Sequence, residues 1–372
     1  MGPWGFPVAP RAKTKRRAWV LPSETRPFHL FCGLFGFWVT PSRPAIFLAR
    51  RSLVFAYITR RILQAIPVMI LVATAVFLLL RMTPGDPTEI LLGPEATPER
   101  AAELRRDLGL DKHIPVQWAL WFSRVLQGDL GESFFLRRSV TQAIWERAEP
   151  TLMLTLLSLA VAVALGLSLG VMAAVRQGSW ADLSAMVVSL AGISMPTFWI
   201  GLNLILVFAV ILGILPVAGY QPLSAGLWEN LRYLILPAVT LGFYDAALLA
   251  RMTRSMMLGV LKENYVRTAR SIGLPERRVV LGHALRNALI PLLTIVGLIF
   301  AGLLGGALVT ETVFNIPGVG RLLIQAVLRR DYQLVQGIVL IIAGAYVLIN
   351  LSIDILYGLL DPRVSRSATP SA

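Results

Sequence analysis

Long runs of apolar residues that are almost free of charge constrain this chain more than any other feature of its sequence. Six such runs cover residues 62–80, 152–175, 183–215, 233–250, 287–310 and 334–353, and Asp245 is the one charge inside them. A bilayer core of about 30 Å needs about 20 helical residues at a rise of about 1.5 Å per residue. Charged residues make up only 15% of the chain, well below the level of soluble domains. The sequence therefore predicts an integral membrane protein.

The number of crossings depends on the run 183–215, which is longer than one span requires and contains Pro196. One bent helix and two separate spans are both possible locally, since proline can kink or break a helix. Loop charge decides between them. Residues 1–61 carry 11 Lys/Arg against one acid and residues 251–286 carry eight against two, whereas residues 81–149 carry nine basic and 11 acidic side chains.

The positive-inside rule places the two basic stretches in the cytoplasm and leaves residues 81–149 outside. This assignment requires 183–215 to count as one crossing. The sequence thus predicts an all-α integral membrane protein with six transmembrane helices, both termini in the cytoplasm, and an external loop domain at 81–149 between the first two helices. Residues 251–286 form the main cytoplasmic loop, and residues 365–372 form a tail.

The first 50 residues do not read as a folded element. They contain seven prolines and a basic cluster at 11–17, and their apolar run 28–39 is too short to span a bilayer. We expect residues 1–53 to be an unstructured or non-native extension, with Val54 as a candidate start. A secretory signal peptide is less well supported, because no small-residue cleavage site follows the apolar run.

The external loop carries helix signals of its own. Residues 97–99 provide an N-cap, a first-turn proline and an acid, and Gly109 provides a stop, so a short helix is predicted between them. Aromatic side chains follow within 118–122 at amphipathic spacing. The sequence favours a small cap on the membrane surface over a docking face for an external partner.

No pattern in the sequence indicates an enzyme. The chain has four lysines, none of which follows a glycine, so a phosphate-cradling Gly-Lys-[Ser/Thr] loop is absent. One cysteine and three widely spaced histidines give no disulfide framework and no metal motif, and we expect neither a metal nor a cofactor. The net charge of +14 lies between the spans, which fits cytoplasmic loops and lipid better than nucleic acid.

Asp245 is a functional candidate because intramembrane carboxylates are costly. A pathway-lining role and a structural hydrogen-bonding role are both open for it.

The most informative segment is the basic loop at 259–291. Apolar residues recur there at helical spacing, namely Leu261, Tyr265, Ala269 and Ile272. Gly273 is expected to close this helix in the left-handed conformation, and Pro275 to open a second one. Such a loop could lie on anionic lipid, but a lipid-binding loop has no need of so tight a turn. We therefore favour a rigid lever that inserts into a partner protein.

The same loop resembles the EAA loop of ABC importer permeases. The residues concerned are 265–274 and 283–291, and further matches are TPGDP at 83–87, GDLGES at 128–133, SMPTFW at 194–199, ETVFNIPGVGR at 311–321, RDY at 330–332 and LDPRV at 360–364. In order and spacing they cover residues 55–364 and resemble most closely the first permease subunit of the dipeptide/oligopeptide/nickel group. Arg267, Thr268 and Ala269 stand where the general pattern has Glu-Ala-Ala.

The resemblance implies the fold of a type I ABC importer permease in the bacterial inner membrane. Such a subunit forms half of the translocation pathway for di- or oligopeptides, or for a related solute such as nickel, by alternating access. Its partners are a second homologous permease, two cytoplasmic ATPases and an external or periplasmic solute-binding protein, and it has no ATPase site of its own.

The resemblance also indicates which residues act in coupling and transport. The expected contacts with the ATPases are Tyr265, Arg267, Thr268, Ala269, Arg270, Gly273 and Leu274. The candidates for lining the pathway are Asp245, Pro196 and Glu311, although Asp245 matches no motif of the family. The alternative is a secondary transporter or channel driven by an ion gradient, which predicts inverted repeats and paired intramembrane charges; the sequence contains no second copy of any segment.

Overall fold

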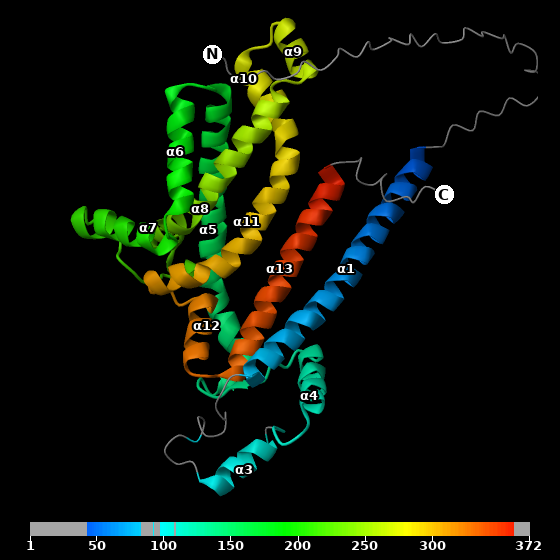
Figure 1. Cartoon of the computed structure of the whole chain (residues 1–372), viewed down its shortest axis with the longest axis vertical. Helices are drawn as coiled ribbons and strands as arrows, with labels where there is room; N and C mark the ends of the chain where they lie inside the picture. The colour runs from blue at the N-terminus through cyan, green and yellow to red at the C-terminus, as the bar shows by residue number, and fades with distance from the viewer. Residues whose placement is uncertain (1–42, 83–91, 93–96, 108, 361–372) are drawn as a thin grey trace, which may run out of the picture. The chain divides into compact units, whose positions relative to one another are not determined.

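The computed structural model describes residues 43–82, 92, 97–107 and 109–360 (Figure 1). Contacts divide the chain into Met1–Leu48 and Ala49–Ala372, and all the apolar spans lie in the second unit. Residues 1–42 of the expected extension lie outside the described residues, as does the expected tail at 365–372, whereas residues 43–53 are helical and belong to α1.

Helices make up most of the described chain. They are α1 (Arg43–Met82), α3 (Pro98–Asp107), α4 (Ile114–Leu126), α5 (Val140–Val175), α6 (Trp180–Ser194), α7 (Thr197–Leu204), α8 (Leu227–Val260), α9 (Asn264–Ser271), α10 (Glu276–Arg278), α11 (Leu285–Val313), α12 (Val319–Leu328) and α13 (Tyr332–Leu360). The π-helical turns η2 (Ile205–Ile211) and η4 (Val279–Ala284) follow α7 and α10, and η3 (Leu223–Ala225) is a 3-10 turn. Strands β1 (Glu132–Ser133) and β2 (Arg138–Ser139) pair antiparallel, with Glu132 opposite Ser139.

Within the described residues, five helices are long and apolar enough to cross a bilayer, and a bent pair supplies a sixth candidate. The five are Thr59–Leu79, Val140–Val175, Leu227–Val260, Glu276–Val313 and Tyr332–Ile353. The predicted all-α membrane fold is confirmed. The bent pair occupies the long run 183–215: α6 ends at Ser194, α7 begins after Pro196, and the two meet at 107°. The single crossing expected there is therefore a broken span or a re-entrant loop.

The second span starts earlier than its apolar run. Helix α5 begins at Val140, where the hydroxyl of Ser139 accepts a hydrogen bond from the Gln142 amide at 3.2 Å. The first turns carry charge, and Arg138 pairs with Glu146 at 2.6 Å. A search for uncharged residues misses these turns, because they are helical without being apolar.

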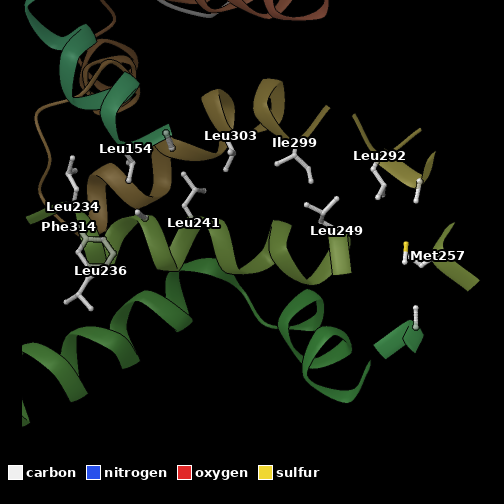
Figure 2. Packing of buried hydrophobic residues seen from close by; sticks show 14 of the residues in the cluster. Leu154, Leu234, Leu236, Leu241, Leu249, Met257, Leu292, Ile299, Leu303 and Phe314 are labelled. Carbon is white, nitrogen blue, oxygen red and sulfur yellow. The ribbon is translucent and has the colours of Figure 1, made fainter. Parts of the chain in front are cut away.

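The hydrophobic core lies between α5, α8 and α11 (Figure 2). Glycines let these helices approach closely, as small residues do in membranes. A Cβ atom on Gly242 of α8 would meet the carbonyl oxygen of Ser158 on α5, and one on Gly170 of α5 would meet the carbonyl oxygen of Ala250. Helices α5 and α8 therefore form one closely packed unit.

The β-hairpin is fixed at the end of the bundle opposite α9 (Figure 1). The Ser133 hydroxyl donates to Asp331 at 2.5 Å, and the Glu132 amide donates to the side chain of Gln333 at 2.8 Å. These bonds attach the hairpin to the start of α13.

Candidate functional site

The loop between α8 and α11 has the predicted helix–turn–helix form. Helix α8 ends at Val260, α9 begins at Asn264, and Gly273 follows α9 with φ of +79°. The amide of Leu274 donates to the carbonyl of Ala269 at 3.3 Å and closes the turn. Pro275 then caps α10. The left-handed turn expected at Gly273 is present.

The inner face of α9 consists of Val266 and Ala269, which are buried against Val279. Leu261 and Leu274 pack around this cluster. The cluster joins α9 to the residues that lead into α11, so α9 is held at both of its ends.

This packing corrects the apolar stripe predicted for the loop. Tyr265 and Ile272 are exposed, with 41% and 71% of their surface accessible. The predicted stripe ran through Leu261, but residues 261–263 form a turn between α8 and α9. The helical spacing therefore restarts at Asn264 and turns Val266 inward.

Two polar contacts fix α9 further. The guanidinium of Arg270 donates to Glu276 through Nη2 at 2.6 Å and Nε at 3.2 Å, across the Gly273 turn. These hydrogen bonds raise the pKa of Arg270 above its ordinary value. The amide of Asn287 on α11 donates to the hydroxyl of Tyr265 at 2.9 Å.

The predicted coupling residues thus divide into two sets. Tyr265, Ala269, Arg270, Gly273 and Leu274 hold the shape of the loop through the contacts described above. Arg267 and Thr268 are exposed, and they form the outer face of α9.

The pathway candidates lie on different elements. Asp245 is half-buried on α8, and within the described part of the chain it has no hydrogen-bond or ion-pair partner. Pro196 forms the break between α6 and α7.

Glu311, the third candidate, is fully buried near the end of α11. Its carboxylate accepts the Thr151 hydroxyl at 2.6 Å and the Arg321 amide at 2.8 Å. The Thr151 hydroxyl in turn accepts the Val319 amide at 2.8 Å. These bonds attach the first turn of α12 to α5 and α11, and a Cβ on Gly318 would collide with the same carboxylate.

Sequence reasoning missed an ion pair between Asp182 on α6 and Arg254 on α8. Two guanidinium–carboxylate bonds join them, at 2.6 and 2.7 Å. Asp182 lies one residue before the apolar run 183–215, and Arg254 counted only as loop charge. The available signal was Ser179, which is an N-cap residue that predicts a helix start before Asp182.

The sequence was compared with known protein families and with curated proteins. Residues 166–366 match the family of binding-protein-dependent transport system inner membrane components, and residues 54–155 match the N-terminal part of such membrane components. The chain belongs to this family. It is 44% identical over 308 residues to a probable peptide ABC transporter permease protein of Sinorhizobium fredii, covering 83% of this chain and 98% of that protein. It is equally identical, with the same coverage, to the glutathione transport system permease protein GsiC of Salmonella paratyphi A.

A solved structure supports the fold independently. The inward-facing MetNI methionine ABC transporter matches 59% of this chain and 97% of its own with a TM-score of 0.50, at 19% identity. The predicted membership in the ABC importer permeases is confirmed, and this permease is a multi-pass transport subunit of the inner membrane. The ion-gradient alternative is set aside by the family match.

Proposed function

We propose that this permease imports di- or oligopeptides as one half of an ATP-driven translocation pathway. The observation that carries the proposal is its similarity, over 98% of their length, to permeases named for peptide and for glutathione, itself a small peptide. Nickel or another small solute is the alternative cargo within the same group.

The assembly that fits this role has three kinds of partner besides lipid. They are a second homologous permease, two cytoplasmic ATPase subunits and a solute-binding protein at the external face. This chain hydrolyses no ATP itself, in keeping with the absence of a Gly-Lys phosphate loop from its sequence. Both termini and α9 then lie in the cytoplasm, as the excess of basic residues in 1–61 and 251–286 indicates.

The outer face of α9 is the proposed contact with an ATPase. Arg267 and Thr268 are exposed there, while the Arg270–Glu276 bonds and the Val266 cluster keep the helix rigid beneath them. A rigid element can pass a displacement on to α8 and α11, whereas a loose loop would absorb it. Alternating access requires such a two-state element that ATP and cargo bias differently.

The pathway side of the proposal rests on α8 and the α6–α7 break. Asp245 lacks a partner among the described residues, so it can present a carboxylate to a cationic group of the cargo, such as a peptide ammonium. Pro196 sets the angle at which α7 leaves α6. Glu311 contributes to the pathway indirectly, because its carboxylate accepts the Arg321 amide and so fixes the position of α12.

Mass spectrometry of the ligand that co-purifies with the partner solute-binding protein tests the cargo. A peptide of two or more residues is the expected result. Bound nickel, or a solute without a peptide bond, would contradict the peptide assignment while leaving the permease role intact.

A further inference from the structure

Asp182 on α6 and Arg254 on α8 form a two-pronged ion pair between neighbouring helices. Arg254 donates Nε to Oδ1 at 2.6 Å and Nη2 to Oδ2 at 2.7 Å, the two-pronged geometry that suits a guanidinium and a carboxylate. The Gly178 amide donates to the same Oδ2 at 3.0 Å. Asp182 is 5% exposed, so its carboxylate joins α8 to both α6 and the turn that precedes α6.

The position of the pair links it to the coupling loop. Arg254 lies in the last turns of α8, and α9 begins just beyond the end of that helix. Figure 1 shows α9 at the end of the bundle where α6 begins and α8 ends. A displacement of α9 therefore reaches Arg254 before it reaches the middle of the membrane.

The rest of the α6–α8 contact is formed by small side chains of α6. The buried residues of α6 after Asp182 are Ala185, Ser189 and Gly192, which lie on one face. Gly192 packs against Phe243 and Ala247 of α8, and the Ser189 hydroxyl bonds the Ala185 carbonyl of its own helix. Small side chains without bonds across the contact permit sliding of the kind seen in shear motions. The ion pair adds a polar connection between α6 and α8 to this apolar packing.

Stability alone is a poor explanation for this pair. Desolvation of Asp182 offsets part of the attraction between the charges. Arg254 keeps 26% of its side chain exposed, and partly exposed ion pairs add little to stability. A role in specifying one arrangement of elements is the better attested use of such pairs.

We propose that Asp182 and Arg254 are positioning residues for energy coupling. When an ATPase moves α9, their ion pair makes α6 move together with α8, and α7, which follows α6 after the bend, moves with them. The inference rests on the proposed role of α9 at the ATPase, and it goes beyond that role by naming the contact that carries the motion onward.

The decisive variant replaces both charges at once, D182L/R254M, so that no unpaired charge is left behind. The complex with its partner subunits is reconstituted in proteoliposomes, and complex yield, basal ATP hydrolysis, its stimulation by the loaded binding protein, and cargo uptake per ATP are measured. We expect unchanged yield and basal hydrolysis, with stimulation and uptake per ATP reduced roughly fivefold or more, the usual range for coupling between sites. R254K, which keeps the charge but loses the two-pronged geometry, should be intermediate.

The matched control is R138Q/E146Q, which removes an exposed ion pair of the same length at the start of α5, at the end of the bundle away from α9. This variant should retain wild-type coupling. Wild-type stimulation and uptake ratio in D182L/R254M would overturn the proposal. If D182L/R254M does not assemble, R254K becomes the test variant, and wild-type coupling in R254K would overturn the proposal. Failure of the proposed function is distinct, because the wild-type complex itself would then show no stimulation.

Discussion

At the scale of single residues, the backbone conformation at Gly273 disfavours a larger side chain, although there is room for one. A Cβ on Gly273 would meet no atom within 4 Å, yet its φ of +79° lies in the region that L side chains rarely adopt. Asp245 presents the opposite case, a side chain whose cost comes from its surroundings rather than its backbone. Both residues could be singled out from the sequence, because each breaks a local pattern.

Gly273→Ala should strain the turn by about 1 kcal/mol and tilt α9 relative to the spans. Membrane insertion should be unchanged, since it depends on the apolar helices, while co-purification with the ATPases falls. Gly259→Ala is the control, because Gly259 also has open space but an ordinary helical backbone. Equal co-purification of both variants would remove α9 from the coupling role.

Asp245→Asn should insert at least as well as the wild type, because a charged Asp at a helix centre costs about 2.5 to 3.5 kcal/mol on the insertion scale. If Asp245 meets a cationic group of the cargo, uptake falls and complex assembly persists, and Asp245→Glu restores part of the uptake. Normal uptake in the Asn variant would return Asp245 to a structural role.

At the scale of elements, the chain holds its helices by a few polar anchors that apolar patterns do not reveal. The start of α12 is bonded to Glu311 at the end of the preceding helix and to Thr151 on α5, which lies far from it in sequence. Apolar runs located the spans, but they could not show that α5 starts within charged residues at Val140, nor that α9 faces inward with Val266. Both features depend on hydrogen bonds and turns rather than on hydropathy.

Thr151→Val should destabilise the protein by about 1 to 3 kcal/mol, because it removes one of the hydrogen bonds to the buried Glu311 carboxylate and leaves the Val319 amide without its hydroxyl acceptor. Thr155→Val is the matched control: Thr155 is also buried, but its hydroxyl bonds only the Thr151 carbonyl of its own helix. The thermal midpoints of the two purified variants measure the difference. Equal midpoints would show that the α12 anchor contributes little.

At the scale of the whole molecule, hydropathy and loop charge suffice for the fold class, and the order of motifs suffices for the family. The N-cap Ser179 places Asp182 on a helix, but its pairing with Arg254 could not be foreseen, since the two are far apart in the chain and only packing of α6 on α8 brings them together. The orientation of the whole chain in the membrane is also a prediction, because it follows from the numbers of basic and acidic residues in all the loops together.

Single cysteines test that orientation. A cysteine at Ser271, exposed at the end of α9, should react with a membrane-impermeant reagent only from the cytoplasmic side, and one at Glu103, exposed on α3, only from outside. Labelling of both from the same side would contradict the six-span topology.

The central claim is that this chain imports peptide by coupling to partner ATPases, and uptake by the reconstituted complex tests it most directly. Proteoliposomes that contain this permease, its permease partner and both ATPases are given a labelled peptide with its binding protein. The account predicts accumulation that requires both ATP and the binding protein, and that persists when ion gradients are dissipated. Uptake without ATP that follows an imposed ion gradient would contradict it.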